Sequence, residues 1–287
     1  MGILPLFTQH SRSWQQNRYV YPVISRRSKG LSIGVNLNPD KVCNFDCVYC
    51  CVDRTTPGAE RDVDLAVLRN ELDEMLRLSC SGELFEQPPF DTTPAHLRRV
   101  NDVAFSGDGE PTSFQRFGEA CKLAAELLET HRRADVKIVV ITNATLFHQK
   151  RVAEALAYLD QHHGEVWAKL DAGTEAYYRE IERTSIPLSR VLENILAAGR
   201  ARPIVIQSLF LQLNGIGPDS SEIDAYIRRL VELVAGGCQI KLVQVYTVAR
   251  GTAVAACTAL SASELDAISQ RVRLETGLLV ETYYGPY

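Results

Sequence analysis

Short apolar, β-branched segments alternate with longer segments of helical periodicity along most of this chain. The apolar segments predict strands at 31–35, 102–105, 136–141, 165–170, 204–211 and 241–246. Apolar residues spaced three and four apart predict helices at 64–78, 114–130, 149–162, 189–200 and 221–234. A helix at 263–274 and a strand at 278–282 are expected to close or flank the sheet. Strands that alternate with helices of this length indicate βαβ units and a parallel α/β sheet.

Two segments interrupt this alternation. Residues 79–98 contain three prolines and a glycine, and we interpret them as a loop-rich insertion rather than a domain boundary. Residues 1–30 show no clear period, and we expect them to form an N-terminal extension packed on the core. The remaining residues, 31–287, are predicted to form a single domain.

The composition is that of an ordinary globular protein. The chain has 287 residues, 46% of them hydrophobic, and a formal net charge of -4. No segment approaches the roughly 18–20 apolar residues of a membrane span, and we identify no signal peptide, so we expect a cytoplasmic protein that does not bind membranes. The charge balance does not favour a broad nucleic-acid surface. Arg26, Arg27 and Lys29 form a local basic patch, which we interpret as solvated, with an anionic substrate as the alternative.

Half of the eight cysteines lie within nine residues, at positions 43, 47, 50 and 51. In a long chain without an export signal, such a cluster indicates a metal site rather than a disulfide framework. The thiolates of Cys43, Cys47 and Cys50, at C-x3-C-x2-C spacing, can bend around one cubane iron–sulfur cluster. A four-iron cluster would then keep one iron open to a small molecule. Zinc is the alternative, although structural zinc usually takes two pairs of ligands.

The position of the cysteine loop also points to chemistry. The loop follows the first predicted strand, which places it at the carboxyl end of the sheet, where α/β folds carry their active sites. Cys51 is a candidate for a fourth ligand, but adjacent cysteines rarely point at the same cluster.

Polar residues also follow the next two predicted strands. The segment Gly107-Asp108-Gly109-Glu110-Pro111 combines glycines, which let backbone approach a ligand, with a carboxylate that can accept from an ammonium group. A glycine turn with a helix-capping acid is the structural alternative. Thr142 and Asn143 end the third strand, either as a helix cap or as ligand contacts.

Later strands carry ionisable and amide side chains. A period of two places Lys169 and Asp171 on one face, where they form either a structural ion pair or a ligand contact. Gln207 and Gln244 need hydrogen-bond partners if buried, which a cofactor or a core network would supply.

The motif Cys43-x3-Cys47-x-Tyr49-Cys50 resembles the signature of the radical S-adenosylmethionine (SAM) superfamily. The resemblance implies a [4Fe–4S] cluster whose open iron is chelated by the amino and carboxyl groups of SAM, with Tyr49 against the adenine. It also implies a partial (β/α)6 TIM-like barrel with parallel strands and outer helices. In this superfamily the reduced cluster gives one electron to SAM, the C–S bond breaks, and a 5'-deoxyadenosyl radical abstracts hydrogen from a substrate.

Later motifs extend the resemblance over about residues 20–270. Residues 107–111 are similar to the Gly-Gly-Glu type element that binds the SAM amino group. Residues 169–174, 207–210 and 243–250 look like the branch grouped with wyosine-base formation enzymes. The resemblance departs at Ala144, where the pattern has glycine, and at the atypical Cys51. The SAM contacts that it implies are Tyr49, Gly107, Asp108, Gly109, Glu110, Pro111, Thr142, Asn143, Lys169, Asp171, Gln207 and Gln244.

The catalytic residues are unknown, and the candidates for a substrate base or a radical-quenching donor are Tyr246, Arg250 and Cys51. Because Cys238 and Cys257 are isolated and form no second cluster motif, we expect an external flavodoxin- or ferredoxin-like electron donor. The substrate is unknown. The alternatives are a wyosine-like tRNA-modifying enzyme, an enzyme that acts on a protein, and a non-catalytic iron–sulfur protein for electron transfer.

Overall fold

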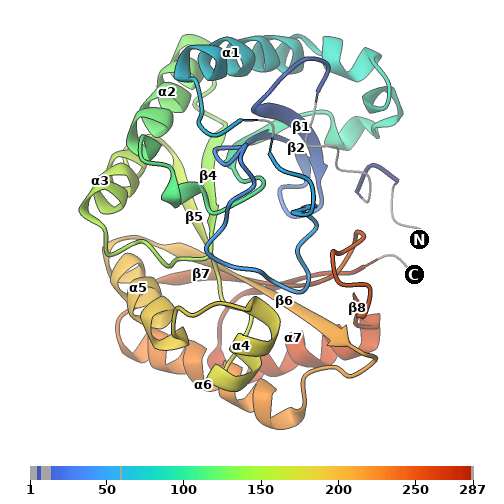
Figure 1. The fold of residues 1–287 in the computed structure, drawn as a ribbon, viewed down its shortest axis with the longest axis vertical. Coiled ribbons are helices and arrows are strands. Elements are labelled where there is room, and N and C mark those ends of the chain that lie inside the picture. Colours follow the sequence, from blue (N-terminus) through green and yellow to red (C-terminus); the bar gives the residue numbers. More distant parts are fainter. Residues whose placement is uncertain (1–4, 8–13, 59, 286–287) are drawn as a thin grey trace.

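A single curled sheet runs through the computed structural model, which describes residues 5–7, 14–58 and 60–285 (Figure 1). Its strands are β1 (Val20–Ser25), β2 (Gly30–Val35), β3 (Val100–Phe105), β4 (Lys137–Thr142), β5 (Gly164–Lys169), β6 (Ile204–Leu213), β7 (Ile240–Thr247), β8 (Cys257–Ala259) and β9 (Val280–Tyr283). The helices are α1 (Leu65–Ser81), α2 (Phe117–Thr130), α3 (Lys150–Leu159), α4 (Glu175–Glu182), α5 (Leu188–Ala201), α6 (Ser220–Ala235) and α7 (Ala262–Thr276). Every helix and strand predicted from the periodicity has a counterpart within a few residues.

The topology is that of an open, partial barrel. Strands β2 to β7 lie side by side in chain order and are parallel, and β9 adds a further parallel strand beside β7. The connecting helices lie outside the curved sheet (Figure 1). β1 pairs antiparallel with β2 at one end, and β8 pairs antiparallel with the end of β6. The predicted partial (β/α)6 barrel with parallel strands and outer helices is therefore confirmed.

Three elements were not predicted, namely β1, α4 and β8. β1 lies in the segment expected to be an N-terminal extension, of which residues 1–4 and 8–13 lie outside the described residues. Pro22 obscures its period, and the sheet tolerates this proline because β1 is an edge strand. α4 has eight residues, too few for a clear helical period. Among the described helices, none has both the length and the apolar character needed to cross a bilayer.

The concave face of the sheet is layered. An apolar layer of Ala104, Val139, Trp167 and Val205 fills its middle. Charged side chains, including Asp102 and Glu165, lie at the amino ends of the strands. The carboxyl ends carry polar residues and face the loop between β2 and α1, which crosses the open side of the barrel (Figure 1). Two residues of this layer, Ala104 and Trp167, line the cavity described below.

Candidate functional site

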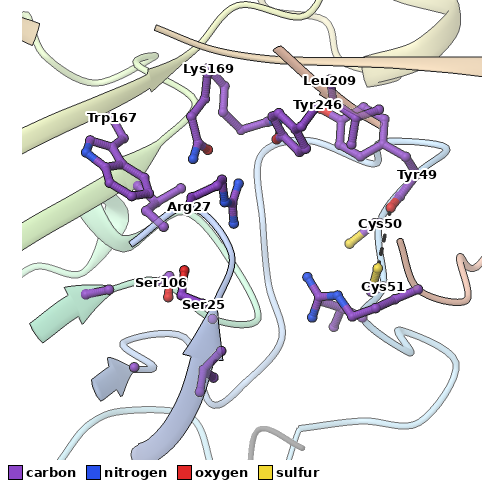
Figure 2. Close-up of a pocket in the computed structure, with 18 of the residues that line it drawn as sticks. Ser25, Arg27, Tyr49, Cys50, Cys51, Ser106, Trp167, Lys169, Leu209 and Tyr246 are labelled. Atoms are coloured by element: carbon purple, nitrogen blue, oxygen red, sulfur yellow. Dashed lines mark hydrogen bonds between the residues drawn. The ribbon is translucent and has the colours of Figure 1, made fainter. Parts of the chain in front are cut away.

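A cavity of about 290 Å³ opens at the carboxyl ends of the strands (Figure 2). The predicted site residues that line it are Cys43, Cys47, Tyr49, Cys50, Cys51, Gly107, Asp108, Gly109, Glu110, Thr142, Asn143, Lys169, Gln207, Tyr246 and Arg250. Pro111, Asp171 and Gln244 do not line it. Asp171 and Gln244 hydrogen bond to residues that do, and Pro111 begins a short 3-10 turn. Most of the predicted site residues therefore lie around one cavity, as expected for residues at the carboxyl ends of parallel strands.

The cysteine loop is held against the end of α4. The amide of Asp46 donates to the Glu182 carbonyl at 3.1 Å, and the amide of Val48 donates to the Ile181 carbonyl at 2.8 Å. The loop forms no helix or strand at these two positions, so the bonds to α4 satisfy backbone amides that would otherwise lack a partner. The position of the thiols therefore depends on an element that lies far along the chain.

Each of the three thiols has a polar side-chain partner, and that of Cys43 is Asn44 Oδ1 at 3.9 Å. The Cys47 thiol donates to Glu182 Oε2 at 2.8 Å, and the Cys50 sulfur accepts from the Arg54 guanidinium at 3.6 Å. Burial, followed by the Glu182 carboxylate, raises the pKa of the Cys47 thiol well above its usual range. Burial also raises the pKa of the Cys43 thiol. A bound metal would favour the thiolate forms.

The sequence did not identify Glu182 or Arg54. α4 contains Glu175, Glu180 and Glu182, and no pattern marks the last of these as the buried one. Arg54 follows Cys51 by three residues, and this proximity to the cysteine motif is the signal that could have found it.

The donor set fits an iron–sulfur cluster, whose irons are normally bound by thiolates. In the part of the chain that the structure describes, no three Cys, His, Asp or Glu side chains are gathered to hold one metal ion. Cys43, Cys47 and Cys50 instead line the cavity wall as separate soft donors, and cubane irons bind thiolates at separate corners. Cys51 is exposed, and its thiol lies 3.8 Å from the Tyr49 carbonyl oxygen.

Glu110 is a buried residue of the cavity wall, and one of its carboxylate oxygens can accept a further hydrogen bond. Its Oε1 accepts from the Thr112 amide at 3.1 Å, the Thr112 hydroxyl at 2.5 Å and the Thr142 hydroxyl at 2.6 Å. Among the described residues, its Oε2 accepts from the Asn143 amide alone, at 2.8 Å. Burial raises the pKa of Glu110, although these hydrogen bonds oppose the rise. Because a carboxylate oxygen offers about two lone pairs, Oε2 can accept one further donor.

Gly107 and Gly109 let the chain approach itself. A Cβ on Gly107 would lie 2.4 Å from the Asn36 side chain, and a Cβ on Gly109 would lie 2.3 Å from the Val42 carbonyl oxygen. Both neighbours belong to the segment that leads into the cysteine loop. The glycine pattern predicts a close approach of the backbone to a ligand, whereas in the structure these glycines also admit this segment of the chain.

Lys169 connects the two sides of the cavity. Its Nζ lies 2.7 Å from Asp171 Oδ2, 3.0 Å from the Tyr246 hydroxyl and 4.8 Å from the centroid of the Tyr49 ring. Behind it, Asp171 accepts from the Tyr49 hydroxyl at 2.5 Å and from the Leu209 amide at 2.7 Å. Burial lowers the pKa of Lys169, but Asp171 and the other anionic neighbours outweigh burial and raise this pKa well above its usual range. Lys169 therefore stays charged.

Gln207 and Gln244 form a buried pair of side-chain amides in which one oxygen has no hydrogen-bond partner among the described residues. Gln207 Nε2 donates to Gln244 Oε1 at 2.9 Å. Gln207 Oε1 is buried and has no hydrogen-bond partner in the described structure. Leaving such a carbonyl unsatisfied costs about 1–3 kcal/mol of folding free energy. Because Gln207 lines the cavity, this oxygen can accept from a bound molecule.

The fold is that of radical SAM enzymes. SuiB from Streptococcus suis, solved with SAM bound, superposes with a TM-score of 0.56 at 15% identity, over 90% of this chain and 49% of SuiB. TYW1, solved with a lysine–pyruvate adduct bound, superposes with a TM-score of 0.51 at 15% identity, over 86% of this chain and 74% of TYW1. The predicted resemblance is confirmed at the level of the fold.

Curated relatives described as UPF0026 proteins come from an archaeon and from bacteria. The one from Methanocaldococcus jannaschii is 30% identical over 178 residues, which cover 61% of this chain and 48% of the relative. One from Helicobacter pylori is 26% identical over 206 residues, which cover 70% of this chain and 58% of the relative. The chain thus spans about half the length of the curated relatives it matches. No family model matches the chain.

Proposed function

We propose that this protein is a radical SAM enzyme. The observation that carries the proposal is that the three thiols of the motif and the unpartnered oxygen of Gln207 line one cavity at the carboxyl end of a partial barrel. Cys43, Cys47 and Cys50 would hold a [4Fe–4S] cluster. When bound, the reduced cluster and SAM would supply one-electron cleavage of the SAM C–S bond, giving methionine and a 5'-deoxyadenosyl radical that abstracts hydrogen from the substrate.

The protein's contribution is to position SAM. Glu110 Oε2 would accept from the SAM ammonium group, and Gln207 Oε1 would accept from a hydroxyl or amine of the nucleoside. Tyr49, whose hydroxyl is fixed by Asp171, would offer its ring to the adenine. Further contacts would come from Gly107, Asp108, Gly109, Thr142, Asn143 and Lys169, with Pro111, Asp171 and Gln244 as positioning residues behind them.

We also propose an external flavodoxin- or ferredoxin-like electron donor. Val42, directly before the first cysteine of the motif, is 64% exposed, and Cys51, directly after the last, is also exposed. The cysteine loop therefore reaches the protein surface, where a partner can approach a cluster held by it.

Anaerobic reconstitution with iron and sulfide tests this function. The protein is then supplied with dithionite and SAM, and 5'-deoxyadenosine is measured. Wild type and Cys80→Ala, a matched variant of an exposed cysteine outside the cavity, should bind iron and form the nucleoside. Cys47→Ala should lose both. A bound cluster without any nucleoside would favour electron transfer instead, and stoichiometric zinc without a cluster would overturn the assignment.

A further inference from the structure

Two arginines enter the cavity from the turn between β1 and β2. Arg26 and Arg27 both line it, and the Arg27 guanidinium lies 5.9 Å from the Trp167 ring centroid and 5.0 Å from that of Tyr246 (Figure 2). Arg26 donates to the Tyr284 carbonyl. The interpretation of this basic patch as solvated therefore does not hold for the two arginines, because they enter the cavity instead of projecting into solvent.

Lys29, the third member of the patch, behaves as expected. Its side chain is 58% exposed and pairs with Glu281 at 2.9 Å outside the cavity. This lysine shows what a solvated basic residue of the same turn does. The two arginines therefore need an explanation of their own.

The charge of the arginines is not neutralised by the described residues. Within residues 5–7, 14–58 and 60–285, no carboxylate forms an ion pair with Arg26 or Arg27. The carboxylates that line the cavity, Asp102, Asp108 and Glu110, already accept hydrogen bonds from other groups. Burial, then the nearby charges of Arg27 and Arg250, lowers the pKa of Arg26 to about 10. Positive charge gathered in a partly desolvated place favours binding of an anion.

We infer that Arg26 and Arg27 bind an oxyanion, a carboxylate or phosphate group, on the substrate. This assignment of a substrate class rests on the proposed radical SAM function. A guanidinium presents its N–H groups in a planar fork that matches a carboxylate or phosphate. Because Trp167 and Tyr246 contact Arg27 through their rings, its N–H edge stays available to a ligand. Tyr246 also bonds to Lys169, so the anion site adjoins the proposed SAM site.

Trp167 reports on this site directly. The chain has two tryptophans, and the other, Trp14, packs against Phe90. In a Trp14→Phe background, Trp167 fluorescence is titrated with pyrophosphate and, separately, with succinate at constant ionic strength. Calorimetric titration of the unaltered chain with both anions gives the same affinities without the background substitution. At least one anion should bind saturably, and the tighter of the two identifies phosphate or carboxylate as the preferred group.

Arg26→Gln and Arg27→Gln should each weaken anion binding at least tenfold. Arg99→Gln, which removes an exposed arginine outside the cavity, should leave it unchanged. Absence of saturable binding, or equal binding by all variants, would overturn the inference. Equilibrium dialysis of cluster-loaded protein supplies a second arm. Equal losses of SAM and anion affinity in Arg27→Gln would assign the guanidinium to SAM and also overturn it.

The two proposals fail in different ways. If wild type forms no cluster and no nucleoside while anion binding persists and depends on both arginines, the radical function is lost and the oxyanion site stands. If nucleoside forms but neither anion binds, the radical function stands and the substrate class assigned here is wrong.

Discussion

Lys169 Nζ lies 2.7 Å from Asp171 Oδ2, and the aspartate side chain is fully buried. The two residues are neighbours on one face at the end of β5. The same carboxylate accepts from the Tyr49 hydroxyl, and the same ammonium lies over the Tyr49 ring. The ion pair thus fixes the ring that we propose lies against the adenine of SAM, through both its polar end and its face.

Replacing Lys169 should show how much the Lys169–Asp171 ion pair contributes to the free energy of unfolding. Lys169→Met is expected to lower the free energy of unfolding by about 3–5 kcal/mol, because it leaves a buried carboxylate without its cation. Lys169→Met combined with Asp171→Asn should recover most of that loss. The asparagine oxygen still accepts from the Leu209 amide, and its NH2 group can donate to the Tyr49 hydroxyl, which donates to Glu182. Urea denaturation followed by circular dichroism measures both. A double variant no more stable than Lys169→Met would contradict the coupling.

The Gln207–Gln244 pair gives a second prediction. Gln244→Leu should lower the free energy of unfolding by about 1–3 kcal/mol, because the buried Gln207 amide then has no partner at either end. Gln207→Leu combined with Gln244→Leu should be close to wild type in stability, since both amides are removed together. The dissociation constant for SAM should rise in the double variant, because the acceptor facing the cavity is gone. Equal SAM affinity in the double variant and wild type would exclude Gln207 as a SAM contact.

Cys51 offers a direct test of the ligand count. Its exposed thiol lies near the Tyr49 carbonyl, on a residue adjacent to Cys50, and we propose that it is not a cluster ligand. Cys51→Ala should therefore retain the wild-type iron and sulfide content after reconstitution, whereas Cys50→Ala should lose it. Loss of iron from Cys51→Ala would identify this cysteine as a fourth ligand.

The sequence predicted those features that depend on local periodicity and on strand ends. The carboxyl ends of parallel strands meet at one edge, so Glu110, Thr142, Lys169 and Gln207 come together although they are distant in sequence. The radical SAM resemblance has glycine at the position of Ala144. The structure gives Ala144 a φ of 61°, in the left-handed region that favours glycine.

Features that depend on one specific tertiary contact could not be predicted. Glu182 is one of three glutamates in a short helix, and only the fold brings it to Cys47. Arg27 resembles its neighbour Lys29 in sequence, but Trp167 and Tyr246 contact Arg27 while Lys29 remains on the surface. Gly107 and Gly109 line the cavity, but a sequence does not show that the partner approaching them is the chain itself.

Glu165, at the amino end of β5, should make stability depend on pH. It is buried, lies 3.1 Å from Lys137 Nζ, also pairs with Lys241, and accepts from the Trp167 indole at 2.7 Å. Burial raises its pKa, but the hydrogen bonds from Lys241 and Trp167 and the charges of both lysines outweigh burial, so the net pKa lies below the ordinary 4.5. A carboxylate with a lowered folded-state pKa stabilises the protein above its unfolded-state pKa. This stabilisation is lost as the pH falls through the folded-state pKa.

Glu165→Gln should therefore be less stable than wild type at neutral pH, by about 1–3 kcal/mol, because two lysines lose their carboxylate partner. The difference between the two proteins should shrink as the pH falls below about 4.5, where Glu165 of the unfolded chain takes up a proton before Glu165 of the folded protein does. Urea unfolding at pH 7, 5, 4 and 3.5 measures this difference, and taking the difference cancels the titration of other carboxylates. A difference that stays constant over this range would show that Glu165 does not change its protonation on unfolding, contrary to the ion-pair geometry.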